Sequence, residues 1–360
     1  MVTEYSLILN KLKNLKIERY SSTRNFIDGQ VTMLSPYISR GILSTNQILK
    51  HLISQGISLK RNEKFIQELA WRDYWQLVWI EKNINKDLKH NQADVLNFGI
   101  SENILNASTG IKAIDKSIEL LYDTGYMHNH LRMYLASLCT NVGKSHWKAP
   151  SKWMYYHLLD GDWGSNALSW QWVAGSNSNK KYIANQDNIN KYTKSNQRNT
   201  ILDISYELLS NIKQPEILSD LSKKVLKTKL PKSNNFKFIE GKDACIYNYY
   251  NLDPKWKNEV DLQRILLIEP SIFIKYPIST KSMNFMLDLA KNINDIKIFV
   301  GEFDELPIKN EMVYFKEHPL NRNYNGVEEP RDWLSSVKGY YPSFFSYWNK
   351  AKKEIYKKNA

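Results

Sequence analysis

The spacing of apolar residues predicts a long helix over residues 63–80, which read EKFIQELAWRDYWQLVWI. Four side chains three or four positions apart share one face of this helix: Phe65, Glu68, Trp71 and Trp75. A second helix is predicted around residues 129–133, where three side chains stand at positions i, i+3 and i+4: Asn129, Arg132 and Met133. The first half of the chain is therefore expected to be helical.

A different pattern begins near residue 262, where short apolar runs alternate with one helical segment. The runs are Arg264–Ile268, Lys297–Val300 and Met312–Phe315, and the helix covers Ser279–Ile293 with Ser279 or Thr280 as its N-cap. A strand, a helix and a strand in this order predict a right-handed crossover between parallel strands. The fold class expected is mainly α, an all-helical domain followed by a small α/β (βαβ) unit.

These patterns divide the chain into three predicted parts. Residues 1–193 form a helical domain, residues 194–260 a basic and partly helical connector, and residues 261–360 the α/β unit with a C-terminal helix. The connector carries runs such as KKVLKTKLPK, and no chemistry is inferred for it.

The charge balance narrows the class of partner. Fifty Lys and Arg against 37 Asp and Glu give a formal net charge of +13. This excess favours a polyanion, nucleic acid before membrane, although a solvated basic surface is the alternative. Two cysteines give neither a disulfide framework nor metal-ligand spacing, and no signal peptide or membrane-spanning run is seen. We expect a cytoplasmic monomer without a metal site.

The chemistry is concentrated between residues 125 and 172, where polar groups are crowded among tryptophans. The motifs are GYMHNHLRM, HW, LLDGDWGSN and SWQWVAG. Residue types alone give an aromatic core helix pair about even odds, because aromatic stripes at helical spacing are usually core. A bound polar ligand explains the density of amides and carboxylates better, because such groups need partners when buried.

In order and spacing, these motifs resemble the flavin-binding core of the DNA photolyase and cryptochrome family. The resemblance covers roughly residues 15–193 and implies a helical domain that binds one FAD. The N-terminal α/β antenna domain usual in the family is missing before it, and the small α/β unit follows it instead. A second chromophore is not expected, and the role of the α/β unit stays open.

The resemblance assigns residues to the flavin. The family usually has Thr-Ser-Arg-Leu-Ser in the diphosphate loop, whereas this chain has Val31 to Ser35, which puts the side-chain contact at Val31 in doubt. The expected cofactor-binding residues are Tyr20, Thr32, Met33, Leu34, Ser35, Arg72, Asn129, Arg132, Asp160, Gly161, Asp162 and Asn166.

It also assigns a lesion pocket and an electron route. The lesion residues implied are Glu68, Trp71, Asn129, Met133 and Trp172, with the two tryptophans on either side of a flipped dimer. The catalytic residues implied are Glu68, Asn129 and Met133, together with Trp170 and Trp147 as the inner and middle members of the electron chain. The usual outer tryptophan falls at Asp94, so either the electron chain stops at two members or it exits through Trp153, Tyr155, Tyr156 or Trp163.

The function that the resemblance implies is light-driven repair of cyclobutane pyrimidine dimers in DNA, a deoxyribodipyrimidine photo-lyase activity. Asn166 is typical of the repair enzymes, whereas plant-type photoreceptors commonly carry Asp there. Enzymes acting on (6-4) photoproducts carry two histidines at the positions of Asn129 and Met133. Two alternatives remain: a cryptochrome-like photoreceptor without repair activity, and a nucleic-acid-binding protein with a structural flavin.

Overall fold

The computed structural model describes residues 1–234, 237–309 and 311–358 and separates into two compact units. Unit 1 contains residues 1–15, 32–80 and 227–360, and unit 2 contains residues 16–31 and 81–226. Unit 1 therefore joins three stretches that lie far apart in the sequence, whereas unit 2 is built mainly from one continuous stretch.

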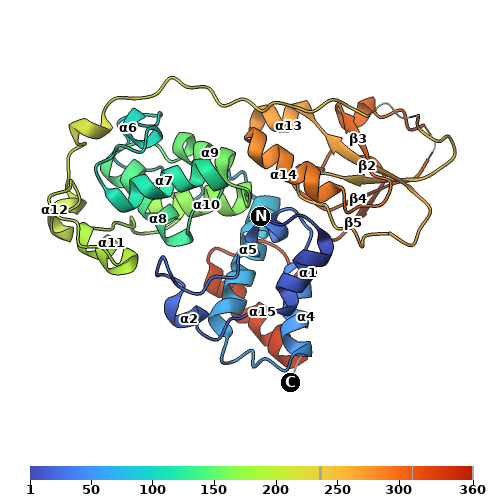
Figure 1. Cartoon of the computed structure of the whole chain (residues 1–360), viewed down its shortest axis with the longest axis horizontal. Helices are drawn as coiled ribbons and strands as arrows, with labels where there is room; N and C mark the ends of the chain where they lie inside the picture. The colour runs from blue at the N-terminus through green and yellow to red at the C-terminus, as the bar shows by residue number, and fades with distance from the viewer. Residues whose placement is uncertain (235–236, 310, 359–360) are drawn as a thin grey trace. The chain divides into compact units, whose positions relative to one another are not determined.

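Unit 2 is helical (Figure 1). Its helices are α2 (Tyr20–Thr23), α6 (Glu102–Leu105), α7 (Lys112–Thr124), α8 (Asn129–Ser137), α9 (Lys148–His157), α10 (Trp163–Ala174), α11 (Gln186–Thr193) and α12 (Tyr206–Ser210), with a π-helical turn at Leu138–Val142 and a 3₁₀ turn at Glu216–Leu218. Local signals set the ends of two of them. Gly125 ends α7 and Gly175 ends α10, both with the positive φ that glycine adopts without strain.

Unit 1 contains both helices and the sheet. Its helices are α1 (Tyr5–Lys13), α3 (Ser35–Ser39), α4 (Thr45–Ser54), α5 (Glu63–Glu81), α13 (Pro270–Lys275), α14 (Thr280–Ala290) and α15 (Phe344–Lys358), with a 3₁₀ turn at Phe303–Glu305. The predicted helices at 63–80 and 279–293 are α5 and α14, and Ser279 caps α14 by accepting from the Ser282 N–H.

The sheet has five parallel strands in the order β3-β2-β1-β4-β5. They are β1 (Ala244–Tyr247), β2 (Gln263–Ile268), β3 (Lys297–Val300), β4 (Val313–Lys316) and β5 (Val327–Glu329). The three predicted strands are β2, β3 and β4, and the helix α14 links the parallel neighbours β2 and β3 as expected. The order is that of a doubly wound sheet, in which the chain runs outward from the central strand β1 through β2 to β3 and then crosses back to β4 on the other side of β1.

Two strands were missed by the sequence analysis. The central strand β1 is only four residues long and lies at 244–247, inside the stretch 194–260 that was predicted as a partly helical connector and in which no strand was named. The edge strand β5 reads VEE and is largely exposed, so it lacks an apolar signal. A strand buried by its neighbours or held at an edge by backbone pairing need not show a long pattern of its own.

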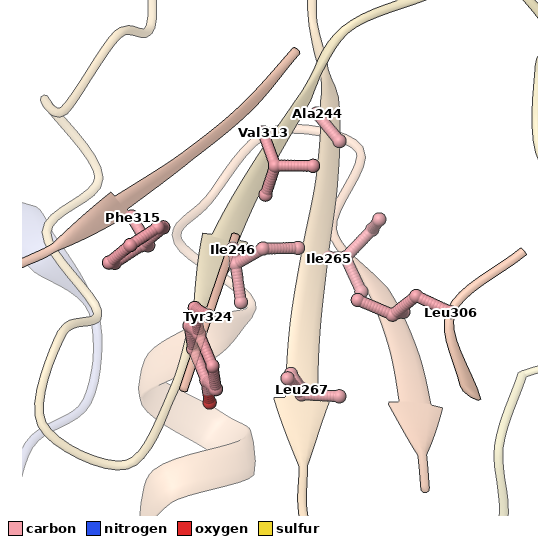
Figure 2. Close-up of a cluster of buried hydrophobic side chains, with 8 residues drawn as sticks. All are labelled: Ala244, Ile246, Ile265, Leu267, Leu306, Val313, Phe315 and Tyr324. Carbon is pink, nitrogen blue, oxygen red and sulfur yellow. The ribbon is translucent and has the colours of Figure 1, made fainter. Parts of the chain in front are cut away.

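The core of the sheet is a cluster of apolar side chains from three strands and two following loops (Figure 2). Ala244, Ile246, Ile265, Leu267, Val313 and Phe315 come from the strands, and Leu306 and Tyr324 complete the cluster. Strand residues two apart point to the same face, which explains the pairing of alternate positions in this list.

A buried arginine joins the 32–80 stretch to the sheet within unit 1. The guanidinium of Arg40 is fully buried and lies 3.3 Å from the ring centroid of Tyr249, just beyond β1. The Arg40 carbonyl also accepts a hydrogen bond from the Leu252 N–H at 2.9 Å. This contact between residues some two hundred positions apart ties residues before 260 to the 32–80 stretch, so unit 1 crosses the predicted boundary at 260.

The segment before α15 is tied to α5 by two hydrogen bonds, one from the Leu334 N–H and one to the Tyr341 carbonyl. The buried Asp73 carboxylate accepts from the Leu334 N–H at 2.7 Å and from the Thr45 hydroxyl at 2.9 Å. The Tyr74 hydroxyl donates to the Tyr341 carbonyl at 3.0 Å. The predicted terminal helix α15 is thus held against the helix that carries Glu68 and Trp71.

Within the described part of the chain, no helix is both long and apolar enough to cross a membrane. The same residues contain no group of three or more His, Cys, Asp or Glu side chains suited to a metal ion. Cys139 and Cys245 are both buried and unbridged.

Candidate functional site

In unit 2, the predicted flavin residues are gathered by the amino ends of two helices. Asn129 is the first residue of α8, and Arg132 and Met133 follow one turn later. Asp160 and Asp162 lie in the loop that leads into α10, and the Asp162 carboxylate caps that helix by accepting from the Ser165 N–H at 2.6 Å. The carboxylate at 162 is therefore held in place by the helix that it starts.

Two of the residues assigned to the cofactor, Arg132 and Asp160, form an ion pair. One guanidinium nitrogen, Nη2, lies 3.0 Å from both oxygens of Asp160, and Nε donates to the Met127 carbonyl at 2.8 Å. The Asp160 side chain is 4 % exposed and that of Arg132 is 20 % exposed. The guanidinium is thus fixed by a carbonyl and by the carboxylate, and the pair is largely removed from water. An ion pair held in this way can shift the protonation and the potential of a group beside it.

Gly161 lies between the two aspartates and has a packing reason of its own. A Cβ built at this position would come within 2.9 Å of the Tyr155 carbonyl oxygen and 3.0 Å of the Leu158 carbonyl oxygen. The tight turn that presents Asp160 and Asp162 therefore needs glycine, independently of any ligand.

Two side chains on α10 carry hydrogen-bonding groups that are suited to a ligand. The Asn166 amide donates one hydrogen bond to the Ser151 carbonyl at 2.8 Å, and an amide NH₂ has a second hydrogen to offer. The hydroxyl of Ser165 is buried, and none of the described residues hydrogen-bonds it. A buried hydroxyl of this kind next to Asn166 is what a polar ligand would satisfy.

The remaining residues assigned to unit 2 are aromatic. Tyr20 lies on α2, half-buried, with the Arg24 guanidinium 6.0 Å from its ring. Trp172 on α10 is 38 % exposed and packs against Tyr182 at 5.8 Å between ring centroids. An accessible tryptophan with one side supported is suited to stacking on a base.

The predicted electron chain is buried. Trp170 and Trp147 are 2 % and 0 % exposed, and the Trp147 indole N–H donates to the Asp87 carboxylate at 2.6 Å. Sequence reasoning missed Asp87, because it lies sixty residues from Trp147 in a polar stretch without pattern. The His146 ring also contacts Asp87, at 3.4 Å.

The candidate outer members fall into different aromatic groups. Trp163 lies 6.4 Å from Trp147 between ring centroids, and Tyr155 lies 5.6 Å from Trp163. Trp153 packs instead with Tyr122, and its indole donates to the Tyr122 hydroxyl at 3.2 Å. Among the four candidates, Trp163 and Tyr155 continue the row of rings from Trp147.

In unit 1, the helix α5 carries three assigned residues on one face. Glu68, Trp71 and Arg72 are half-buried and stand at i, i+3 and i+4. The Arg72 guanidinium donates to the Ser39 hydroxyl at 3.0 Å, which brings it to the short helix α3 that follows the predicted phosphate loop.

That loop has a backbone shape suited to an anion. Met33 has φ of 54°, in the left-handed region, and Leu34 after it is right-handed, with φ of −90° and ψ of −14°. Consecutive residues of opposite hand turn successive N–H groups to one side and form an anion-binding nest. Left-handed methionine is uncommon, and such strain is frequent at ligand sites. Thr32 and Ser35, on either side, are both half-buried.

Trp71 has a neighbour that the sequence did not reveal. The ring of Phe344, from α15, lies parallel to it at 3.8 Å between centroids with an interplanar angle of 8°. One face of the predicted lesion platform is therefore covered by the C-terminal helix of the same unit.

A continuous part of the chain matches a known protein family. Residues 65–201 match the FAD binding domain of DNA photolyase. This segment is similar to a photolyase-type FAD-binding domain. The match confirms the resemblance to the photolyase and cryptochrome family, and FAD as the cofactor of that domain, and it contains every assigned residue except Tyr20 and the loop 32–35.

Curated relatives carry the name deoxyribodipyrimidine photo-lyase. The protein of Alkalihalophilus pseudofirmus is 31% identical over 172 residues, which are 44% of this chain and 34% of that protein. The protein of Vibrio cholerae is 31% identical over 176 residues, 45% of this chain and 36% of that protein. The chain thus spans about a third of the length of each.

Among solved structures, a Synechocystis cryptochrome has a TM-score of 0.46 at 22% identity, covering 52% of this chain and 43% of that one. An archaeal photolyase from Sulfolobus tokodaii with two FAD molecules has a TM-score of 0.45 at 19% identity, covering 60% of this chain and 52% of that one.

Proposed function

We propose that this protein is a deoxyribodipyrimidine photo-lyase, which repairs cyclobutane pyrimidine dimers in DNA by light-driven electron transfer from reduced FAD. The observation that carries the proposal is the complete lesion set in the photolyase-type domain: Glu68, Trp71, Asn129, Met133 and Trp172. A photoreceptor that only signals has no need of residues that hold a dimer.

The chain fits the cofactor in both units. In unit 2 the buried Ser165 hydroxyl and the oriented pair of Arg132 and Asp160 suit a polar ring edge. In unit 1 the nest at Met33 and the cation at Arg72 suit phosphates. Bound FAD supplies the electron that light excites, a chemistry no side chain can replace. The residues proposed to hold it are Tyr20, Thr32, Met33, Leu34, Ser35, Arg72, Asn129, Arg132, Asp160, Gly161, Asp162 and Asn166.

The protein's own contribution is to hold and polarise the lesion. Trp71 and Trp172 offer aromatic faces to a base that has left the duplex. Glu68, one turn before Trp71 on the same face of α5, would hydrogen-bond the base edge. Asn129 would bind both the lesion and the cofactor, and Met133 would pack against the dimer with a soft, adaptable side chain.

The partner proposed is DNA containing cyclobutane pyrimidine dimers, which the net charge of +13 attracts. A monomer in the cytoplasm is sufficient for this activity. None of the contacts among the described residues favours the alternative of a photoreceptor. The alternative of a structural flavin leaves the intact pair of Arg132 and Asp160 unexplained.

The test is repair of a dimer-containing oligonucleotide by chemically reduced protein under blue light. We expect dimers to disappear in light and to persist in the dark. The matched variants are Glu68→Gln, which keeps a hydrogen bond but not the charge, and Gln67→Glu, a reverse change at the adjacent residue. Glu68→Gln should keep its FAD and repair more slowly per absorbed photon.

Two results would contradict the proposal at different levels. A protein that holds FAD and binds DNA but repairs nothing in light would be a photoreceptor or a binding protein. A colourless protein that also fails to take up added FAD would lose the cofactor assignment as well.

A further inference from the structure

The C-terminal helix α15 lies along the helix that carries the predicted lesion platform. At its amino end Phe344 stacks on Trp71. Toward its carboxyl end, Lys352 pairs with Glu63 at 2.8 Å and the Tyr356 hydroxyl donates to the Leu59 carbonyl at 3.1 Å. The length of α15 therefore follows α5 and the turn before it, within unit 1.

The two faces of α15 differ sharply. Its inner face is apolar and buried, and consists of Phe344, Tyr347, Trp348, Ala351 and Ile355. Its outer face is exposed and consists of Phe345, Asn349, Lys350, Lys353 and Lys357. Positions 345, 349, 353 and 357 are four apart and form one row along the helix. We call Lys350, Lys353 and Lys357 the α15 lysines.

The positive charge of this outer face is not balanced by the acidic residues around it. Glu63 is engaged by Lys352, and Glu354 accepts from the N–H and the hydroxyl of Ser336. The turn before α5 adds two more exposed cations, Lys60 and Arg61. Lys350 lies over the ring of Tyr341, with Nζ 5.0 Å from the ring centroid, which leaves its charge in place.

We propose that the α15 lysines bind the phosphate backbone of the DNA strand beside the lesion. This inference rests on the proposed function and adds a contact surface to it. A row of cations complements a polyanion, and Lys353 and Lys357 are separated by about 6 Å along the helix axis, which lets their long side chains reach different phosphates. Phe344 fixes the register, because it ties the amino end of the row to the ring of Trp71.

The experiment compares two triple variants of the full-length, FAD-loaded protein. The test variant replaces the α15 lysines: Lys350→Gln, Lys353→Gln and Lys357→Gln. The control variant replaces three exposed lysines of the α/β part of the same unit: Lys275→Gln, Lys281→Gln and Lys309→Gln. Both variants carry three fewer positive charges than the parent, and a urea titration establishes that both remain folded.

Binding to dimer-containing duplex is measured in the dark from 50 to 200 mM salt. Each phosphate that a lysine no longer neutralises lowers the slope of log K against log salt by about 0.9, so three such phosphates lower it by about 2.7. The parent should then weaken about 40-fold more than the test variant over this fourfold change in salt. The control variant should keep the slope of the parent.

Equal slopes for the test variant and the parent would overturn the inference, as would an equal fall in both triple variants, which would reflect general charge alone. If the test variant keeps the parent's salt dependence of DNA binding but no longer binds phosphatidylserine vesicles, the outer face of α15 binds a lipid surface instead. If the parent itself does not bind dimer-containing DNA, the proposed function fails rather than the role of α15.

Discussion

The two units hold their candidate residues by different means. In unit 2, Asn129, Arg132, Asp160 and Asp162 come from one stretch and are fixed by helix caps and near neighbours. In unit 1, Glu68, Trp71 and Arg72 lie on a single helix, but the groups packed around that helix come from the far end of the chain. Local capping can be read from a motif, whereas packing between distant segments cannot, because it depends on the complete fold.

The largest expected effect concerns the contiguous stretch of unit 2. With Trp170→Phe, light should no longer reduce bound oxidised FAD, because the residue assigned next to the cofactor can no longer supply an electron. Repair should persist when the FAD is reduced chemically. Flavin absorbance under steady illumination measures the photoreduction, and the loss of dimers from the DNA measures the repair.

A matched variant sharpens this result. Trp153→Phe removes an equally buried tryptophan that packs with Tyr122 rather than with Trp147, and it should photoreduce normally. Normal photoreduction in Trp170→Phe would remove that residue from the electron route, and lost repair after chemical reduction would show damage to the fold.

The next effect tests the buried pair. Arg132→Met leaves the Asp160 carboxylate buried without its cation, which costs about 3–5 kcal/mol of unfolding free energy. Urea unfolding of the FAD-free protein measures this cost, and flavin absorbance of the purified variant should fall. As a control, Arg198→Met removes an exposed guanidinium that pairs with Asp187 and Asp203 at the surface, and the unfolding free energy should change far less, because water screens exposed ion pairs.

Unit 1 should show a pH dependence that arises from its distant contacts. Burial raises the pKa of Asp73 to about 6, although the Leu334 N–H and the Thr45 hydroxyl oppose the shift. A carboxyl whose pKa is higher in the folded state stabilises the fold fully below its unfolded pKa of about 3.9, and this contribution is lost as the pH rises through about 6.

The unfolding free energy should therefore fall by about 2 kcal/mol between pH 4 and pH 6 from this group alone. Asp73→Asn cannot titrate, so the difference between the parent and Asp73→Asn in urea titrations should change by that amount. A difference that stays constant with pH would mean that Asp73 keeps an ordinary pKa in the fold.

An effect of similar size is expected for the platform itself. Trp71→Ala should weaken binding of dimer-containing DNA by about 1–3 kcal/mol, the cost of one stacking surface, while the FAD content is retained. Because Phe344 covers one face of Trp71, a base can stack only on the other, and Trp71→Phe should keep most of the affinity. Loss of FAD in Trp71→Ala would show instead that the residue is part of the core.

The sequence by itself determined the helical FAD-binding segment, the long helix α5, the crossover between β2 and β3, and the pair of Arg132 and Asp160. The helix α5 and the crossover depend on residues close together in the chain, so periodicity and capping rules suffice for them. The positions of Glu68 and Trp71 on one face of α5 followed from the same rules. The FAD-binding segment and the residues Arg132 and Asp160 were implied by the resemblance to a known family.

Only the tertiary structure decided the rest. The sequence did not reveal that β1 is the central strand, that Arg40 is buried against Tyr249, or that Phe344 covers Trp71. The partners of Arg40 and Trp71 lie some two to three hundred residues away in the chain. A short strand, a buried cation and an aromatic stack are stable only when other segments shield them from water, and no local pattern records which segments those will be.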